Sequence, residues 1–446
     1  MMGLSRVSLQ HRARAQVLAP LGATLNYGAP RRGTLLSRKA NPAQRLLNGI
    51  HMPRTSAPGS PPIDTRSTGK IAAKVLVCVT EDWFALSHFQ PLIRRLCLLT
   101  GEVVVVTRSS GRMAEIEALG ARTIDLEYNR ASMNPVREAK TARQLAAIVR
   151  TERPDVVHLI AMKPIVLGGL ALHFASAPHA VVHMTGLGFL AISDTPKARV
   201  ARQVALTIIR RLIARQGSWL LVENPEDLAF LEAGGVKPGG RVSMLGGAGI
   251  DPAAFPAMPE AGNALPIAAF VGRMIRSKGV AVLMEAARLL EARQIPLAIE
   301  LYGESDDGNP EAIPGHMLTS WSDGRRTRYM GFTRDVAAVW RRADIFVLPA
   351  LSREGMPRAL LEAAASGRPI VVTDVPGCRH FVRNGVEGFI VPPGDAEALA
   401  DVLQRLAVDP ALRARLGAAA RARVLDGYTE AQVEAGISAA YHAALA

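Results

Sequence analysis

The sequence predicts an α/β protein made of two doubly wound parallel sheets that face each other across a cleft. Short apolar runs, typical of strands buried on both faces, alternate along the chain with helical segments. The alternation stops in a Gly- and Pro-rich stretch near residues 246–262 and then restarts. The chain has 446 residues, of which 49% are hydrophobic, and this is enough for two separate cores.

The first half is expected to begin near Lys74, where a polar stretch gives way to an apolar run. Strands that alternate with helices at this spacing imply parallel βαβ units with right-handed crossovers. The predicted strands are 74–80, 103–106, 123–126, 155–160, 180–182 and 219–222, and the predicted helices include 86–99, 113–119 and 136–149.

The second half repeats the pattern. Its predicted strands are 267–271, 297–301, 344–348, 370–372 and 389–391, with helices at 279–290 and 359–365 and three closing helical segments. We predict a domain at 71–245, a linker at 246–263, a second domain at 264–426 and a C-terminal helix at 427–446 that packs back on the first domain. Such sheets bind ligands at the carboxyl ends of their strands.

Most of the net charge of +14 lies in residues 1–70, which hold eleven Lys and Arg and one acid, Asp64. This segment lacks a hydrophobic period and is expected to be disordered. Three other interpretations of this segment stay open. It resembles a transit peptide, its basic residues could contact anionic lipid, or the protein could start at Met52. The remaining residues are only mildly basic, so the charge is weak evidence for a nucleic-acid partner.

Other classes of protein are not favoured. A transmembrane helix is not expected, because the best candidate, 159–177, is interrupted by Lys163 and Pro164. Three distant cysteines, Cys78, Cys97 and Cys378, suit a reducing compartment and have no metal-ligand spacing.

The strongest local signal is the string SREGMPRALLE at 352–362, directly after a predicted strand. Gly355 and Pro357 predict a turn into a helix, whose free N–H groups form an anion site suited to a phosphate. Glu362, inside that helix, can reach back toward a ligand, and Glu354 lies in the preceding loop. Two carboxylates beside an anion site are expected to bind sugar hydroxyls.

A second string, GRMIRSKG at 272–279, also links a predicted strand to a helix. Gly272 permits close approach of a ligand, while Arg273 and Lys278 place two cations at the carboxyl end of the strand. Such a pair would neutralise a diphosphate. Taken alone, the string is equally consistent with an ordinary basic loop.

Together these strings resemble glycosyltransferase family 4, retaining enzymes of the GT-B fold. The family's paired glutamates, separated by seven intervening residues, match Glu354 and Glu362, and the strings TDVPG at 373–377 and NGVEG at 384–388 also match. The resemblance covers roughly residues 74–445. It implies a nucleotide-sugar donor, most simply a UDP-sugar, bound by Gly272, Arg273, Lys278, Glu354, Gly355, Met356 and Glu362.

The resemblance assigns catalytic roles to Arg273, Lys278 and Glu354. The two cations would hold the donor diphosphate, Glu362 the ribose, and Glu354 the transferred hexose. No Asp-x-Asp metal motif follows an apolar strand, and Asp306-Asp307 is interpreted as a turn. Neither a metal nor another cofactor is therefore expected. Because no nucleophile pair is evident, front-face attack assisted by the leaving phosphate is the favoured mechanism.

The N-terminal half narrows the resemblance. Four strings are similar to those of bacterial transferases that extend undecaprenyl-diphosphate saccharides or lipopolysaccharide. They are DWF at 82–84, KPI at 163–165, TGLGF at 185–189 and ENPED at 223–227. Polyprenyl-linked or polysaccharide acceptors are therefore expected, with His88 and Lys163 as candidate acceptor-side residues. Many relatives place a sugar-contacting His in the loop near 183; here His183 is offset and is interpreted as a strand-end residue.

Residues 197–215 predict a basic amphipathic helix. Val200, Val204, Ile208 and Leu212 recur every four residues, which also suits an ordinary helix that covers the sheet. The interpretation combines both: the apolar side faces inward and the cations face an anionic membrane. These cations are Lys197, Arg199, Arg202, Arg210, Arg211 and Arg215.

The resulting hypothesis is a cytoplasmic enzyme on the inner face of the plasma membrane, active in cell-surface glycan synthesis. The first alternative keeps the fold but changes the chemistry, to that of a nucleotide-sugar epimerase or phosphorylase. The second alternative is a basic nucleic-acid-binding protein. The paired glutamates argue against the first alternative. The lack of an RNP-like string, zinc spacing or aromatic array argues against the second.

Overall fold

The computed structural model describes residues 70–128, 134–187, 195–306 and 308–446. The predicted N-terminal extension, apart from Lys70, lies outside the described residues, as do Gly188 and Phe189 of the 185–189 string. The described residues all belong to one compact unit, residues 68–446.

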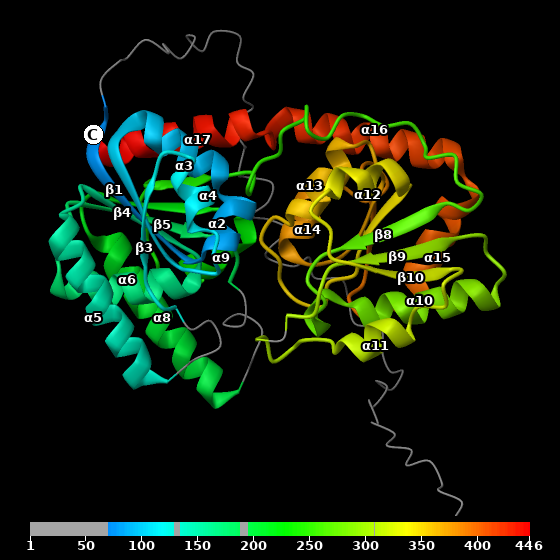
Figure 1. Cartoon of the computed structure of the whole chain (residues 1–446), viewed down its shortest axis with the longest axis horizontal. Coiled ribbons are helices and arrows are strands. Elements are labelled where there is room, and N and C mark those ends of the chain that lie inside the picture. Colours follow the sequence, from blue (N-terminus) through cyan, green and yellow to red (C-terminus); the bar gives the residue numbers. More distant parts are fainter. Residues whose placement is uncertain (1–69, 129–133, 188–194, 307) are drawn as a thin grey trace, which may run out of the picture. The chain divides into compact units, whose positions relative to one another are not determined.

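The first half is built on a seven-stranded parallel sheet with the order β3-β2-β1-β4-β5-β6-β7 (Figure 1). The chain winds outward from β1 to β3, crosses back, and continues from β4 to β7. The switch point therefore lies between β1 and β4, where Val75 pairs with Val156. The strands are β1 (Ala72–Glu81), β2 (Thr100–Arg108), β3 (Arg122–Asp125), β4 (Val156–Ile160), β5 (His179–Met184), β6 (Ser218–Val222) and β7 (Val242–Met244).

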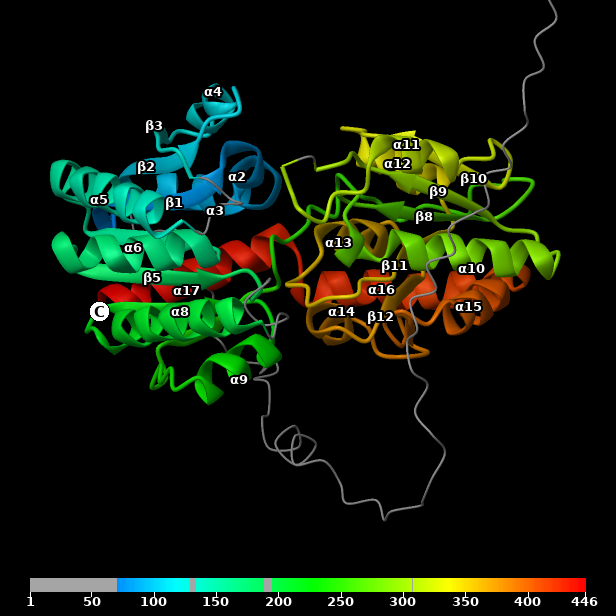
Figure 2. The same ribbon diagram turned by 90° about the horizontal axis from the view of Figure 1, so that it is seen from below.

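Helices cover both faces of this sheet. In Figures 1 and 2, α5, α6 and α8 lie on one face, and α3 and the C-terminal helix α17 lie on the other. Alternate residues of β1 divide between two cores: Leu76 and Cys78 face one helix layer, and Val75 and Val77 the other. The helices are α2 (Asp82–His88), α3 (Gln90–Leu99), α4 (Met113–Glu117), α5 (Pro135–Glu152), α6 (Met162–Phe174), α8 (Pro196–Ala214) and α9 (Pro225–Ala233).

The second half repeats this winding on a six-stranded parallel sheet with the order β10-β9-β8-β11-β12-β13. Its switch point lies between β8 and β11. The strands are β8 (Ile267–Val271), β9 (Ala298–Tyr302), β10 (Thr327–Gly331), β11 (Ile345–Leu348), β12 (Ile370–Thr373) and β13 (Gly388–Val391). The helices are η1 (Arg276–Lys278), α10 (Val280–Ala292), α11 (Gly315–Ser320), α12 (Val336–Arg342), α13 (Arg358–Ala365), α14 (Pro376–Phe381), α15 (Ala396–Val408), α16 (Pro410–Gly427) and α17 (Glu430–Leu445).

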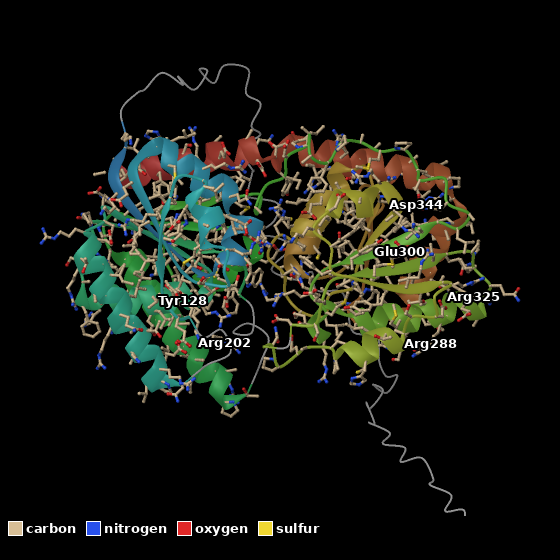
Figure 3. The ribbon with its side chains drawn as sticks, in the orientation of Figure 1. Tyr128, Arg202, Arg288, Glu300, Arg325 and Asp344 are labelled. Carbon is tan, nitrogen blue, oxygen red and sulfur yellow. The ribbon has the colours of Figure 1, made fainter. Side chains whose placement is uncertain are left out.

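Two buried carboxylates anchor the second sheet, and both are labelled in Figure 3. Glu300 on β9 accepts hydrogen bonds from Arg342 and Tyr302. Asp344 accepts from the Ile267 N–H and from the side chain of Asn263, which ties the end of the linker to the strand edge. Because burying an unpaired charge is costly, these contacts are what allow both carboxylates to be buried.

The predicted fold class is confirmed, with local differences. The predicted helix 86–99 is two helices, α2 and α3, because Phe89 leaves helical geometry with φ −125° and ψ 15° before Pro91 begins the next turn. Two edge strands, β7 and β10, were not predicted. Both are partly exposed, so neither shows the continuous apolar run of a central strand.

Candidate active site

The two C-terminal strings meet at the carboxyl ends of β8 and β11. The Leu351 N–H donates to the Ser277 carbonyl at 2.8 Å, which joins the two loops through their backbones. Gly279 makes this approach possible. Its φ is +75°, and a Cβ at this position would lie 1.8 Å from the Pro349 carbonyl oxygen. The predicted phosphate-loop residues are therefore neighbours of the predicted sugar-binding residues.

An ion pair joins the two strings at their functional side chains. Lys278 Nζ lies 2.8 Å from Glu354 Oε1, with only 17% and 15% of the two side chains exposed. The second predicted cation, Arg273, is paired with Asp306 at 2.7 Å. The sequence had indicated no role for Asp306 beyond a turn. Both cations thus have a fixed carboxylate partner beside the strand ends.

Gly272 lies directly after β8, close to the end of β9. Its N–H donates to the Tyr302 carbonyl at 3.0 Å. Its own carbonyl oxygen would lie 1.8 Å from a Cβ on Gly303, where φ is +141°. A side chain on Gly303 would force the two strand ends apart, so the glycine keeps the Arg273 loop close to β9.

Helix α13 carries the second glutamate of the predicted pair. Glu362 is buried, and burial raises the pKa of its carboxyl while nearby Arg358 opposes the rise. Arg358 pairs with Glu362 at 2.9 Å and also donates to the Ser87 carbonyl, which belongs to α2 in the first half. Arg358 therefore links the donor helix to the predicted acceptor side.

His88 lies within the field of three donor-side cations. Burial, together with Arg358, Lys278 and Arg273, lowers the pKa of His88 to about 3. The imidazole is therefore neutral at physiological pH. Its Nδ1 lies 2.7 Å from Ser87 Oγ. Residues predicted separately in the two halves are thus placed around one region of the molecule.

Lys163, the other predicted acceptor-side residue, has its closest described carboxylate elsewhere. Its Nζ lies 3.0 Å from Glu138 Oε1 at the start of α5. The nearby backbone is unusual, because Ala161 has a φ of +68° and donates to the His183 carbonyl. This hydrogen bond joins the start of α6 to β5, and Lys163 is not among the cations that affect the pKa of His88.

His183 is a residue of β5 and is buried. Its Nδ1 lies 3.4 Å from Nε2 of His158, whose Nδ1 in turn lies 2.8 Å from the Tyr441 hydroxyl. Burial lowers the pKa of His183 to about 4. This chain links the two central strands to α17.

The acidic string at 223–227 has a role that the sequence did not indicate, since the string served only to narrow the resemblance. Glu223, at the end of β6, accepts the Met356 N–H at 2.8 Å. Asp227 pairs with Arg353 at 2.9 Å. The Met356 amide, predicted to face the donor, is thus engaged by the other half. Burial, reinforced by nearby Asp227, raises the pKa of Glu223 to about 8.

Helix α8 was predicted to turn its whole apolar stripe toward the sheet, and the structure shows that only part of the stripe is buried. Ile208 and Leu212 are buried, but Val200 and Val204 are 66% and 51% exposed, so the predicted inward stripe does not extend to the start of the helix. The reason is that Ala198 and Ala205 occupy the buried side of that first part instead.

The predicted cations of α8 divide into groups. Arg199, Arg210 and Arg211 are exposed. Arg215 donates to the Ala177 carbonyl, and Arg202, labelled in Figure 3, lies beside the apolar contact of α8 with Leu187 and Phe230. The side chain of Lys197 lies outside the described residues. The exposed valines and arginines therefore share the outer surface of the helix.

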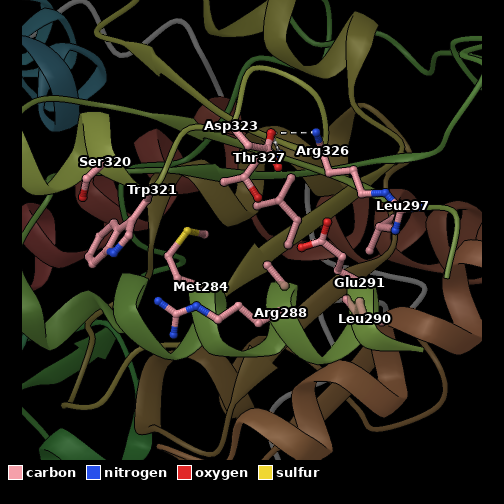
Figure 4. A pocket seen from close by; sticks show the side chains of 12 residues that line it. Met284, Arg288, Leu290, Glu291, Leu297, Ser320, Trp321, Asp323, Arg326 and Thr327 are labelled. Carbon is pink, nitrogen blue, oxygen red and sulfur yellow. Dashed lines mark hydrogen bonds between the residues drawn. The ribbon is translucent and has the colours of Figure 1, made fainter. Parts of the chain in front are cut away.

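A cavity of about 150 Å³ lies in the second half, away from the carboxyl ends of the strands (Figure 4). It is bounded by Leu297 and Thr327, at the amino ends of β9 and β10, and by Arg288 and Trp321. Since ligands of such sheets bind at the carboxyl ends, this cavity is not the candidate site. Among the described residues, no group of three or more His, Cys, Asp or Glu side chains could hold a metal ion. No helix in the same ranges is both long and apolar enough to cross a membrane.

Comparisons with known proteins agree with this geometry. A family described as glycosyl transferase 4-like matches residues 74–216, and one described as glycosyl transferases group 1 matches residues 266–409. The chain is 27% identical over 345 residues to the N,N'-diacetylbacillosaminyl-diphospho-undecaprenol α-1,3-N-acetylgalactosaminyltransferase of Campylobacter jejuni, covering 74% of this chain and 89% of the relative.

Two further similarities have the same character. The UDP-Gal:α-D-GlcNAc-diphosphoundecaprenol α-1,3-galactosyltransferase of Escherichia coli is 24% identical, over 70% of this chain and 81% of its own. The crystal structure of Anabaena HepE in complex with UDP-glucose superposes with a TM-score of 0.66 at 17% identity, over 83% of this chain and 99% of that one. The first half therefore matches the glycosyl transferase 4-like family and the second half the glycosyl transferases group 1 family, and the chain is a glycosyltransferase of the two-sheet GT-B fold.

Proposed function

We propose that the protein moves a hexose or N-acetylhexosamine from a UDP-sugar to a polyprenyl-diphosphate-linked saccharide or polysaccharide in the synthesis of a bacterial cell-surface glycan. The names of the Campylobacter and Escherichia relatives support this substrate class. The single observation that carries the proposal is the convergence of the two donor strings at the strand ends, where the Leu351 N–H donates to the Ser277 carbonyl and Lys278 pairs with Glu354 at 2.8 Å.

This convergence suits a reaction that expels a nucleoside diphosphate. The bond between the sugar C1 and the diphosphate oxygen breaks, and a bond from C1 to an acceptor hydroxyl oxygen forms. Arg273 and Lys278 would stabilise the negative charge that grows on the departing diphosphate. The leaving phosphate would take the proton of the acceptor hydroxyl, so that attack occurs on the face that the diphosphate leaves and the configuration is retained.

The remaining residues would hold the substrates. Glu354, fixed by Lys278, would accept hydrogen bonds from hydroxyls of the transferred sugar, and Glu362 from the ribose. Neutral His88 would accept a hydrogen bond on the acceptor side. We propose that cationic side chains replace a metal ion in this site.

The direct test is thermal-shift binding of the full chain to UDP, GDP, ADP and CMP in the presence of EDTA. A ligand that binds only the folded state raises the melting temperature by mass action. We expect a shift with UDP that is lost in Arg273→Ala. Arg276→Ala is the matched control, because Arg276 lies in the same loop but is exposed.

Two outcomes would overturn the proposal. One is the absence of a shift with any nucleotide. The other is release of UDP from a UDP-hexose at the same rate without any saccharide acceptor, which would favour a hydrolase that transfers the sugar to water. A trapped covalent glycosyl-enzyme would overturn the front-face mechanism alone.

We further propose that the enzyme is peripheral on the cytoplasmic face of the plasma membrane, with α8 as the contact. Val200 and Val204 would enter the interface while Arg199 and Arg211 meet anionic headgroups. The exposure of both valines beside these arginines supports the proposal. In a parallel α/β unit the start of a helix lies at the carboxyl ends of the strands, so this contact would adjoin the acceptor site.

Vesicle flotation tests this contact. Phosphatidylcholine vesicles with and without phosphatidylglycerol are compared for the full chain and for the double variant Arg199→Glu, Arg211→Glu. We expect binding that requires phosphatidylglycerol and falls at least about tenfold in the variant, since each basic residue contributes ~1 kcal/mol. Arg288→Glu, on α10 and 67% exposed, is the control. Equal binding to both vesicle types would contradict the proposal.

A further inference from the structure

We infer that Glu223 is a positioning residue of the donor site, holding the Gly355–Met356 turn so that Glu354 stays opposite Lys278. The inference rests on the proposed function and adds a residue from the opposite half of the molecule to the donor site. Nothing in the local sequence of the donor strings indicates this residue.

The central contact is a buried hydrogen bond between the halves. Glu223 Oε2 accepts the Met356 N–H at 2.8 Å, and Glu223 is only 6% exposed. A buried N–H that loses its acceptor pays the full cost of desolvation. The turn between Glu354 and α13 therefore depends on a side chain that follows β6 in the first half.

The turn itself fits a socket in which side chains are excluded. A Cβ on Gly355 would lie 2.4 Å from both Glu223 Oε2 and the Thr185 carbonyl oxygen. A Cβ on Gly377 would lie 1.2 Å from the Gly355 carbonyl oxygen, and one on Gly247 would lie 2.6 Å from Met356 Cβ. The socket is thus bounded by the residue that follows β5, by the linker and by α14, and Glu223 closes it.

Two ion pairs hold the same segments together on either side. Asp227 contacts Arg353 at 2.9 Å, one residue before Glu354. Glu226 contacts Arg379 on α14 at 3.1 Å, next to the wall formed by Gly377. The three acidic residues of the 223–227 string therefore each bind a different point around the turn.

The consequence is that the position of Glu354 is set by both halves. Within the donor half, Glu354 is held by Lys278 and by its carbonyl, which accepts from the Gly377 N–H at 3.2 Å. Glu223 fixes the next two residues from outside. Loss of Glu223 should therefore impair recognition of the sugar more than recognition of the UDP moiety.

The experiment measures the dissociation constants of UDP, UDP-galactose and UDP-N-acetylgalactosamine by calorimetry for the full chain, Glu223→Ala and Glu223→Gln. In Glu223→Ala we expect the tighter of the two UDP-sugars to bind about tenfold more weakly, and UDP to change less than threefold. Glu223→Gln keeps an acceptor for the Met356 N–H and should restore binding to within about threefold of the wild type. Glu232→Ala, exposed on α9, is the control.

A second readout, amide hydrogen exchange of residues 352–358 without nucleotide, separates this inference from the proposed function. Faster exchange in Glu223→Ala but not Glu223→Gln supports the positioning role even if no nucleotide binds, in which case only the proposed function fails. Unchanged exchange and unchanged affinity in Glu223→Ala overturn the inference. Tighter binding of the UDP-sugar in Glu223→Ala would also overturn it, because Glu223 would then be occupying a group that the donor needs.

Discussion

The two halves contribute to the candidate site in different ways. The second half supplies two continuous strings, 272–279 and 352–362, each following one strand, with their functional side chains already paired to one another. The first half supplies single residues that follow separate strands: His88 at the end of α2 after β1, Thr185 after β5 and Glu223 after β6. The donor side of the site is thus largely assembled within one half. The opposite side consists of single residues that come from separate segments of the chain.

This difference affects what a mutation should do. Removing a charged side chain from one donor string leaves its partner on the neighbouring string without an ion pair. Both side chains are proposed to contact the donor, so one substitution affects two contacts with it. A residue removed from the first half alters one contact at a time. Substitutions on the donor side should therefore reduce the rate of reaction steeply, while those on the other side should act through geometry or stability.

The largest effect is expected for Lys278→Ala. The substitution removes a cation proposed to stabilise the departing diphosphate and leaves Glu354 without its partner. We expect kcat to fall by roughly 10²–10³-fold, the range for loss of one preorganised electrostatic contact. Steady-state transfer assays measure the change, with Arg276→Ala as the control. A decrease below fivefold would mean that the donor side does not depend on this pair.

An intermediate effect is expected for Gly377→Ala, which tests the socket where the halves meet. The added methyl would lie 1.2 Å from the Gly355 carbonyl oxygen and must displace the turn. Overpacking of this kind costs about 1–3 kcal/mol. Chemical denaturation should show that loss. Gly315→Ala should be neutral, because no heavy atom lies within 4 Å of the corresponding position. Equal stability of the two variants would show that the turn moves freely.

The smallest effect concerns His88 and pH. Because the pKa of His88 is lowered to about 3 in the folded protein, the folded state excludes a proton that the unfolded chain accepts near pH 6.5. Stability from the neutral imidazole is therefore present above pH 6.5 and is lost as pH falls toward 3. Between pH 7.5 and about 5.8 the wild type should lose about 1 kcal/mol more than His88→Gln. The exposed His316 provides the control substitution, and identical losses in all three proteins would contradict this assignment.

Much of the fold could be predicted because parallel strands are buried on both faces and appear as unbroken apolar runs, such as Val75–Val79. The strands that were missed lie at the sheet edges. There one side of the strand meets solvent: Thr327 and Arg328 interrupt the apolar run of β10, and Met330 is exposed. The break between α2 and α3 was missed because Pro91 suits the first turn of a new helix as well as a kink.

The donor strings could be predicted because their residues are close in sequence and share a strand end. Glu223 could not be assigned a role in the same way, since its partner Met356 lies 133 residues away. The acidic residues of 223–227 are an available signal, but only the topology places the end of β6 opposite the start of α13. The exposure of Val200 was also out of reach, because periodicity alone does not say which part of a helix the sheet covers.

Helix α17 has a consequence for dividing the protein into modules. Its Val433, Ile437 and Tyr441 lie in the core of the first half with α3, β5 and β6, although the chain reaches them only after completing the second half. A gene truncated in the linker would encode a first half that lacks α17, so the apolar surface that this helix covers would be exposed to solvent. A chimera that exchanges acceptor halves between related transferases should therefore take both the first 245 residues and the last helix from the same parent. Joining two parents at a single point in the linker would separate α17 from the sheet it covers.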